Sequence, residues 1–347
     1  MTPQLEISTQ GALGLITLNR PEAINALSRE MIDGITETLT AWRDDPDIGL
    51  ILFEGRGSRG FCSGGDVRAV RQLVLDGQFA EADAYFAAEY GMNGLISTFP
   101  KPLAAIGHGV VMGGGIGIFG HCRYRFAPPG SRFAMPEAAI GFVSDIGVNA
   151  LLAEVPEARA LAFLLAGLPV GTGDALALGL CDAAIDPARL EALHGGLVAA
   201  AEADVVDSAV VRTMEAESIE PSAAVFCAQA DVLDDAFAAP SAAEIAAAVA
   251  TRAAAEPAFE PLSKALALRS PTSLEAIVVS HRAARHDPDI DAVLALDLRM
   301  ARFMIRQPDF AEGVRAVLVD KDQAPRWQPR DFAGIDAAGL SASTLTT

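Results

Sequence analysis

The chain has few cysteines and few basic residues for its length. Four of the 347 residues are cysteine, and none of them forms a CxxC pair or a Cys/His spacing typical of a metal site. No signal peptide precedes them, so we expect reduced thiols in the cytoplasm. Lys and Arg number 26 against 45 Asp and Glu, which gives a net charge of -19. The negative electrostatic field of such a chain repels phosphate backbones and anionic lipid headgroups, which argues against nucleic acid and membrane-surface partners.

A long uninterrupted apolar run is also missing. The segment from Pro102 to Cys122 carries no formal charge, but it contains several glycines and His108. A helix that spans a bilayer needs about 20 predominantly apolar residues. We therefore expect a buried strand, a glycine turn and a short buried helix here. A second histidine, His121, lies near the end of the run, and we interpret both histidines as packing or hydrogen-bonding residues.

Several common catalytic and cofactor motifs are absent or incomplete. GxSxG and GxxxxGK[ST] do not occur, which argues against a nucleophile-elbow serine hydrolase and against a P-loop. Residues 115–120 match GxGxxG, and Glu137 follows at the distance of a ribose contact. Pro128 and Pro129 come too soon, however, for the full helix that a dinucleotide-binding βαβ unit requires. We expect no nicotinamide or flavin cofactor.

Apolar residues make up 51% of the chain, enough for a large core and a second lobe. Apolar spacing predicts a helix over 26–43. Short apolar runs predict strands at 13–18, 49–54, 102–107 and 124–127. Strands that alternate with helices favour a layered α/β core. After about Pro187 the strand signals give way to alanine-rich helical patterns, with a capping box at Ser241 and a helix start at Ser270.

We therefore divide the chain into an α/β core over residues 1–190, which holds the site, and a helical region over residues 191–347. Within the second region, His281 and His286 lie in a charged segment that we expect to be exposed. The last residues, 337–347, are small and polar, which is typical of a loose terminus.

Two carboxylates stand in an otherwise uncharged run, FAMPEAAIGFVSDIG, at residues 133–147. Charged groups rarely lie among apolar neighbours unless they are paired or functional. Glu137 and Asp145 are eight residues apart. A single helix would not stack their side chains on one side, and Gly141 would interrupt such a helix. Only a turn can bring them together. Taken alone, either one is equally explained as a capping residue.

Two glycine turns precede that run. FCSGGD at 61–66 follows a predicted strand, and Asp66 is suited to cap a helix over 67–75, while the Gly65 N–H is free to face a cleft. In MGGG at 112–115, the glycines serve close packing or place the Gly114 N–H at a helix N-terminus facing an anion. Acid groups beside exposed peptide donors can activate water against a carbonyl while the donors hold the oxyanion.

In this order, the segments resemble the crotonase superfamily of acyl-CoA enzymes, and most closely its 3-hydroxyisobutyryl-CoA hydrolase branch. The matching segments, which span most of the chain, are LNRPEAINALS (18–28), FCSGGDVR (61–68), EYGMNGLISTFPKPLAAIGHGVVMGGGIG (89–117), FAMPEAAIGFVSDIG (133–147), SPTSL (270–274) and EGVRAVLVDKDQAPRWQP (312–329). General crotonases lack the last of these, so it points to this branch.

The resemblance implies a spiral of ββα turns, an α/β fold, followed by an all-helical C-terminal region. It implies an oxyanion hole made by the N–H groups of Gly65 and Gly114. It also implies that Glu89, Gly114, Glu137 and Asp145 bind the substrate, with Glu137 and Asp145 as the catalytic acids.

One position separates hydrolase from hydratase within the superfamily. Gly117 stands where enoyl-CoA hydratases carry the first of two glutamates, and Asp145 stands where they usually have glycine. This pattern fits hydrolysis of a short acyl-CoA thioester better than hydration of an alkene. The resemblance to the hydrolase branch implies 3-hydroxyisobutyryl-CoA, in valine catabolism, as the substrate, while the sequence leaves the exact acyl group open. We expect no metal, because the peptide donors serve as the electrophile, and no cofactor besides the CoA of the substrate. Relatives often form trimer-based homo-oligomers, but the helical region leaves the oligomeric state of this chain open. The alternatives are an enoyl-CoA hydratase or isomerase, and a non-catalytic CoA-binding protein.

Overall fold

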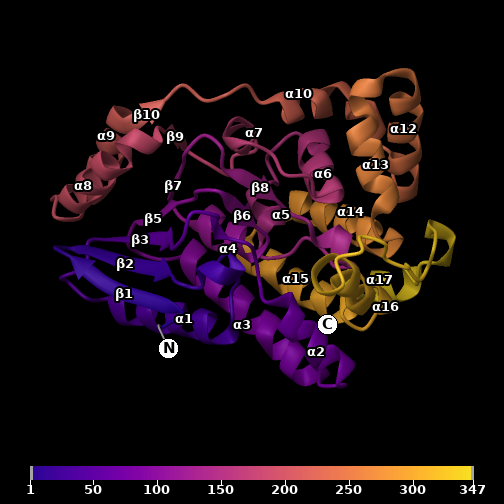
Figure 1. Ribbon diagram of the computed structural model, residues 1–347, viewed down its shortest axis with the longest axis horizontal. Helices are drawn as coiled ribbons and strands as arrows, with labels where there is room; N and C mark the ends of the chain where they lie inside the picture. The colour runs from indigo at the N-terminus through magenta and orange to yellow at the C-terminus, as the bar shows by residue number, and fades with distance from the viewer. Residues whose placement is uncertain (1–2, 345–347) are drawn as a thin grey trace. The chain divides into compact units, whose positions relative to one another are not determined.

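The computed structural model describes residues 3–344, which form two compact units built from segments that alternate along the chain (Figure 1). The first unit takes the chain up to Gly65 together with residues 91–133 and 170–225. The second takes residues 66–90, 134–169 and the chain from Phe226 onward. The predicted boundary near residue 190 remains a prediction.

A seven-stranded sheet with the order β1-β2-β3-β5-β7-β9-β10 runs through the first unit. The neighbours from β2 to β9 pair in parallel, while β1 and β10 pair antiparallel at the two edges. A smaller sheet has the order β4-β6-β8. The strands are β1 (Leu5–Gln10), β2 (Leu13–Leu18), β3 (Leu50–Gly55), β4 (Gly60–Cys62), β5 (Leu103–Ile106), β6 (Val110–Met112), β7 (Tyr124–Ala127), β8 (Arg132–Ala134), β9 (Ala183–Ile185) and β10 (Ser218–Ile219).

The predicted strands are all present, and their bounds agree within one residue at each end. Edge strand β1 escaped prediction because four of its six residues are exposed, so that it lacks the apolar run of a buried strand. Strand β10 lies in the region expected to be helical, but it is only two residues long. The short helices and turns of this unit are η1 (Pro21–Ala23), α1 (Arg29–Trp42), α4 (Gly114–His121), α7 (Thr172–Ala177), η3 (Pro187–Arg189), α8 (Leu190–Ala201) and α9 (Val206–Glu217).

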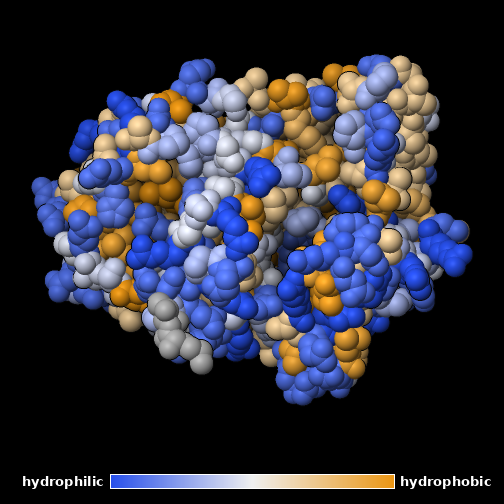
Figure 2. Space-filling model, viewed as in Figure 1, coloured by the Kyte–Doolittle hydropathy of each residue, from blue (hydrophilic) through white to orange (hydrophobic). Residues whose placement is uncertain are grey.

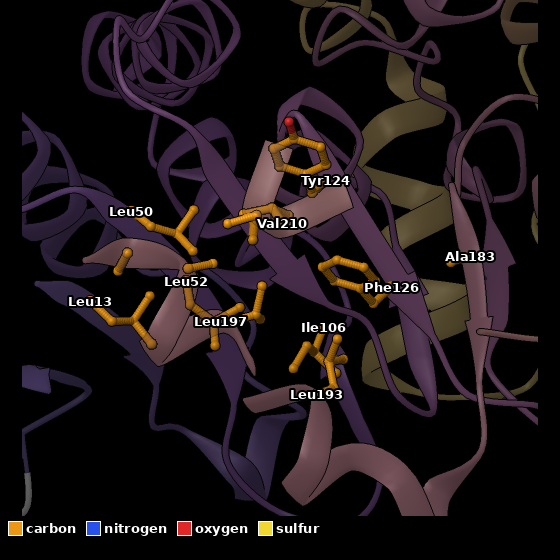
Figure 3. Close-up of a cluster of buried hydrophobic side chains, with 14 of the residues drawn as sticks. Leu13, Leu50, Leu52, Ile106, Tyr124, Phe126, Ala183, Leu193, Leu197 and Val210 are labelled. Atoms are coloured by element: carbon orange, nitrogen blue, oxygen red, sulfur yellow. The ribbon is translucent and has the colours of Figure 1, made fainter. Parts of the chain in front are cut away.

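Helices α8 and α9 cover one face of the seven-stranded sheet. Figure 3 shows Leu193 and Leu197 of α8 and Val210 of α9 among side chains from the sheet, including Leu52 and Phe126. All five are buried, and burying a large aliphatic or aromatic side chain stabilises the fold by about 1.5–3 kcal/mol. The core of the first unit therefore joins residues more than 150 positions apart.

The second unit is helical apart from its turns. Serine or aspartate side chains cap three of its helices as expected: Asp66 accepts from the Ala69 N–H, Ser241 from Glu244 and Ser270 from Ser273. Its elements are α2 (Val67–Leu75), α3 (Phe79–Ser97, which continues into the first unit), η2 (Glu137–Ile140), α5 (Val148–Leu151), α6 (Glu157–Ala166), α10 (Val225–Val232), α11 (Asp234–Phe237), α12 (Ala242–Ala255), η4 (Pro257–Phe259), α13 (Glu260–Leu268), α14 (Pro271–His286), α15 (Ile290–Met304), α16 (Pro308–Val314), η5 (Arg315–Val319, a π-helix), η6 (Phe332–Gly334) and α17 (Ala337–Thr344). In Figure 2 the surface over α12 and α13 contains many weakly hydrophobic residues, which reflects the alanine content of α12.

Two expectations for the helical region are wrong. His281 is fully buried, because α14 packs against several helices, among them α5, α6, α12 and α15, and only His286 at the helix end is exposed. The expected loose terminus is a helix, α17, over residues 337–344, where Leu340 is buried and α17 packs against α15. Residues 345–347 lie outside the described part of the chain. Small residues concealed this helix from sequence reasoning because they carry little apolar periodicity.

The glycine-rich run 102–122 folds as strands β5 and β6 and the buried helix α4, as expected apart from the additional strand β6. Within residues 3–344, no helix is both long enough and apolar enough to cross a bilayer. The four cysteines are buried free thiols.

Asn25 joins the segment after β2 to the strands that carry the first glycine turn. Its buried amide nitrogen donates to the carbonyls of Arg56, Gly60 and Phe61 at 2.9–3.2 Å, and its Oδ1 accepts from the Arg20 N–H at 2.8 Å. We expect Asn25→Ala to lower the free energy of unfolding by about 2–4 kcal/mol in urea denaturation, because it leaves buried backbone groups unpaired. The exposed helix variant Thr40→Ala is the control, with an expected change within about 0.5 kcal/mol. Equal effects of the two variants would contradict this role.

Candidate active site

Two glycine turns lie side by side in the first unit because the strands before them are parallel neighbours. Strand β4 pairs with β6, with Cys62 opposite Val111, so the residues that follow both strands emerge at the same edge. A Cβ built on Gly64 would lie 3.5 Å from the Gly114 nitrogen. The structure thus brings together the turns that carry Gly65 and Gly114.

Backbone geometry at these turns requires glycine. Gly64 has a φ of 113° and Gly113 a φ of 49°, both in a region that side chains disfavour. Helix α4 begins at Gly114, so the N–H of this residue has no acceptor within the helix. Within residues 3–344, neither the Gly65 N–H nor the Gly114 N–H donates to a protein acceptor. Two peptide donors of this kind can hold a developing oxyanion.

Four buried carboxyl groups gather in the second unit. Glu89 comes from α3, Glu137 opens the turn η2, Asp145 lies in the loop that follows, and Asp297 comes from α15. Their exposed fractions are 2%, 6%, 5% and 0%. Gly141, with a φ of 68°, ends η2 after one turn, so the chain turns back between Glu137 and Asp145 as the sequence predicted.

Hydrogen bonds satisfy only part of this carboxyl cluster, defined as Glu89, Glu137, Asp145 and Asp297. The Tyr90 hydroxyl donates to Asp145 Oδ2 at 2.5 Å, and the Gly147 N–H donates to Asp297 Oδ2 at 2.8 Å. One oxygen on each of Glu89, Glu137 and Asp297 is buried without a hydrogen-bond partner in the described chain. Buried polar atoms are normally paired, so these unpaired oxygens indicate polar groups that arrive with a ligand or water.

Burial favours the protonated forms of these acids. It raises the pKa of Glu89 to about 8 and that of Asp145 to about 7, and it raises the pKa values of Glu137 and Asp297 well above the usual range. The charge of Asp145 raises the pKa of each of the other three further. The Tyr90 hydroxyl partly opposes the effect of burial on the pKa of Asp145, because it stabilises the anion.

Backbone packing against α16 fixes the turn that carries Glu137. A Cβ on Gly141 would lie 2.2 Å from the Asp309 carbonyl oxygen, and a Cβ on Gly313 would lie 2.4 Å from the Ile140 carbonyl carbon. The Ser270 N–H donates to the Ala138 carbonyl at 3.2 Å. The late helices α14 and α16 thereby support a turn that lies more than 130 residues earlier in the chain.

Sequence reasoning missed Tyr90 and Asp297. The signal for Asp297 is present in the sequence, because this aspartate interrupts the apolar face of a helix that carries Val293 and Met300. Tyr90 follows Glu89 directly and gave no separate signal. No cluster of three or more His, Cys, Asp or Glu side chains suited to a metal ion occurs in the described residues.

Residues 13–343 match the sequence pattern of the enoyl-CoA hydratase/isomerase family. The Rattus norvegicus protein named mitochondrial 3-hydroxyisobutyryl-CoA hydrolase is 32% identical over 344 residues, which cover 98% of this chain and 88% of that protein. Arabidopsis thaliana 3-hydroxyisobutyryl-CoA hydrolase 1 is 33% identical over 334 residues, 94% of this chain and 87% of that protein.

Two crystal structures are similar over almost the whole chain. They are a carnitinyl-CoA dehydratase from Mycobacterium thermoresistibile, with 33% identity and a TM-score of 0.89, and an enoyl-CoA hydratase from Rhodobacter sphaeroides 2.4.1, with 32% identity and a TM-score of 0.89. Each comparison covers 99% of this chain and 97% of the other. These similarities confirm the expected crotonase fold with a helical C-terminal region.

Glu89 allows the carboxyl cluster to be tested through stability. An unfolded glutamate releases its proton near pH 4.5, whereas folded Glu89, with a pKa of about 8, retains it. Between these values the unfolded state binds fewer protons, so the free energy of unfolding falls as pH rises. Burial lowers the pKa of His281 to about 4, which acts in the opposite direction, but only below about pH 6.5. From pH 6.5 to 8 we expect Glu89→Gln to remove about 2 kcal/mol of the decline.

Urea denaturation at pH 6.5 and pH 8 measures this difference. Glu81→Gln is the matched control, because Glu81 is an exposed acid on the same helix. The free energy of unfolding of this variant should fall between the two pH values by as much as that of the wild type. A decline in Glu89→Gln as steep as in the wild type would refute the assignment of a retained proton to Glu89.

Proposed function

We propose that this chain, which belongs to the enoyl-CoA hydratase/isomerase family, hydrolyses the thioester of a short acyl-CoA. The proposed substrate is 3-hydroxyisobutyryl-CoA, and the products are 3-hydroxyisobutyrate and free CoA, a step of valine catabolism. The names of the rat and Arabidopsis relatives support this substrate. The observation that carries the proposal is the set of acids. Glu137 and Asp145 are buried together, while residue 117 is a glycine and so supplies no acid.

The second candidate is hydration of an enoyl-CoA, which the names of the two solved structures described above favour. By resemblance, hydratases add water across a double bond with two glutamates, and the first of them would stand at position 117. Glycine there removes one of the two acids. The presence of Asp145, where hydratases usually have glycine, supplies a different acid and supports thioester hydrolysis.

The proposed oxyanion hole consists of the N–H groups of Gly65 and Gly114. Neither group has a protein acceptor in the described chain, and their turns are neighbours. Hydrogen bonds from both to the thioester oxygen become stronger as negative charge develops on that atom. This differential binding lowers the barrier to attack at the carbonyl carbon.

Glu137 is the proposed catalytic carboxylate. In one route it attacks the carbonyl carbon, CoA leaves as the thiolate, and water then hydrolyses the acyl–glutamyl anhydride to release the acid and restore Glu137. In the other route Glu137 takes a proton from water, which attacks directly. Asp145 orients the hydroxyl of the acyl group or adjusts the proton affinity of Glu137. Glu89 helps to close the acyl pocket.

The proposed reaction uses neither a metal nor an organic cofactor apart from the CoA of the substrate, because the peptide donors polarise the carbonyl. We also propose action in the cytoplasm, although the rat relative is named mitochondrial. A trimer-based homo-oligomer remains part of the proposal, on the basis of the family resemblance.

A thiol-release assay across a panel of short acyl-CoAs tests the function. We expect the wild type to release thiol from 3-hydroxyisobutyryl-CoA, and Glu137→Gln to lower kcat by about 10³-fold or more, since the amide can neither attack nor accept a proton. The same proteins are assayed for loss of the double bond of crotonyl-CoA.

The alternatives give different results in this assay. Consumption of crotonyl-CoA without release of thiol would identify a hydratase. Slow thiol release that Glu137→Gln leaves unchanged would favour a non-catalytic CoA-binding protein.

Gly64→Ala tests the oxyanion hole. Alanine rarely adopts a φ of 113°, so the turn must rotate and move the Gly65 N–H. We expect kcat for thiol release to fall about 10²-fold, the effect of losing one oxyanion donor, with a smaller change in KM. Gly77→Ala is the matched control, because Gly77 also has a positive φ, 73°, but nothing lies within 4 Å of the added Cβ. If both variants keep wild-type kcat, these N–H groups are not the oxyanion donors.

A further inference from the structure

Asp297 is the one member of the carboxyl cluster for which the proposed mechanism has no role. It lies in the middle of α15, is fully buried, and comes 150 residues after Gly147, in the loop that carries Asp145. We call this loop, residues 141–147, the catalytic loop. Its Oδ2 accepts a hydrogen bond from the Gly147 N–H at 2.8 Å. A buried carboxyl group is expensive to keep, so its contact with the catalytic loop requires an explanation.

The loop that receives this hydrogen bond has an unfavourable backbone. Ile146 has a φ of 59° and Gly147 a φ of 73°, so two consecutive residues adopt the left-handed conformation. For a β-branched residue such as isoleucine this conformation is strained and persists only where the surroundings impose it. The strained residue directly follows Asp145, and the residue after it is anchored to Asp297.

Asp145 is thereby held from two directions. Its carboxyl group receives the Tyr90 hydroxyl at 2.5 Å, and its backbone is followed by the turn anchored on α15. Helix α15 also packs against α5, which begins directly after this turn at Val148. If the anchor is released, the strained turn can relax, and the Asp145 carboxyl group then loses its fixed direction.

We propose that Asp297 is a positioning residue, which holds the Ile146–Gly147 turn through the Gly147 N–H and so directs the Asp145 carboxyl group toward the acyl part of the substrate. This inference rests on the proposed function, because it assigns Asp145 to the reacting acyl group. The essential property of Asp297 is an acceptor oxygen at that point and not its charge.

The charge balance of the cluster agrees with this role. Burial, and then the neighbouring charge of Asp145, raise the pKa of Asp297 well above the usual range, which favours the neutral form of Asp297. A neutral carboxyl oxygen still accepts the N–H of Gly147. Asparagine offers the same acceptor at the same distance from the backbone and cannot ionise, so Asp297→Asn preserves the anchor while Asp297→Ala removes it.

The experiment compares two esters, 3-hydroxyisobutyryl-CoA and isobutyryl-CoA, which lacks the hydroxyl group. Thiol release is measured for the wild type, Asp297→Asn, Asp297→Ala, Asp145→Asn and the double variant. Asp291→Ala is the control, because it removes an exposed carboxylate from the same helix. Thermal unfolding monitors the fold of every variant, and Asp297→Ser replaces the alanine variant if that protein does not fold.

We expect Asp297→Ala to lower kcat/KM about 10–100-fold, with the same preference between the two esters that Asp145→Asn shows. Asp297→Asn should retain activity within about 3-fold, and Asp291→Ala should equal the wild type. In the Asp145→Asn background, Asp297→Ala should add less than about 3-fold, because both changes disable the same group.

Other results overturn the inference. If Asp297→Asn loses as much activity as Asp297→Ala, or if the effects of Asp145→Asn and Asp297→Ala multiply, Asp297 does not act through the Asp145 turn. A wild type that releases no thiol from any ester instead refutes the proposed function, and the same variants are then compared in the hydration of crotonyl-CoA.

Discussion

Burial of several carboxyl groups in one place is the constraint on which the rest of the second unit depends. An ionised carboxylate in a medium of low polarity is too costly to keep without partners. Within residues 3–344 the carboxyl cluster forms no ion pair, and the charge of Arg299 opposes the raised pKa of Asp297 only in part. The protein therefore retains protons on most of these groups and supplies a few neutral donors. The Tyr90 hydroxyl and the Gly147 N–H are two such donors.

This arrangement lowers the stability of the fold and increases the reactivity of the acids. A carboxyl group with a raised pKa weakens the fold at neutral pH, yet it is more basic once ionised and therefore more effective as a base or nucleophile. The rigid surroundings keep such groups in place. Glycine at positions 141 and 313 allows the Glu137 turn and α16 to approach through their backbones, so that no flexible side chain separates them. The turn is consequently held by the main chain itself.

The sequence predicted the fold class and the local elements where the pattern is strong. Runs such as Leu13–Leu18 are apolar enough to be recognised as strands, and serine and aspartate caps such as Asp66 and Ser270 marked helix starts correctly. It did not predict what depends on distant contacts. His281 was expected to be exposed because its neighbours in sequence are charged, whereas tertiary packing of α14 buries it. Glu137 and Asp145 were recognised from their apolar surroundings. Asp297 was overlooked although it too interrupts an apolar face, and its contact with a turn 150 residues earlier depends on tertiary packing that a single sequence does not show.

The alternation of the two units along the chain has a consequence for biogenesis. The segment 66–90 leaves the ribosome early, but most of the residues that complete its unit, from Phe226 onward, are synthesised more than 130 positions later. Neither unit can close as a contiguous block, and contacts between such distant segments slow folding. Synthesis that stops before the last third of the chain leaves the helix with Glu89 without α15 and α16. A fragment that ends near residue 190 therefore lacks the late helices of the second unit, and it is expected to expose apolar surface to chaperones or proteases.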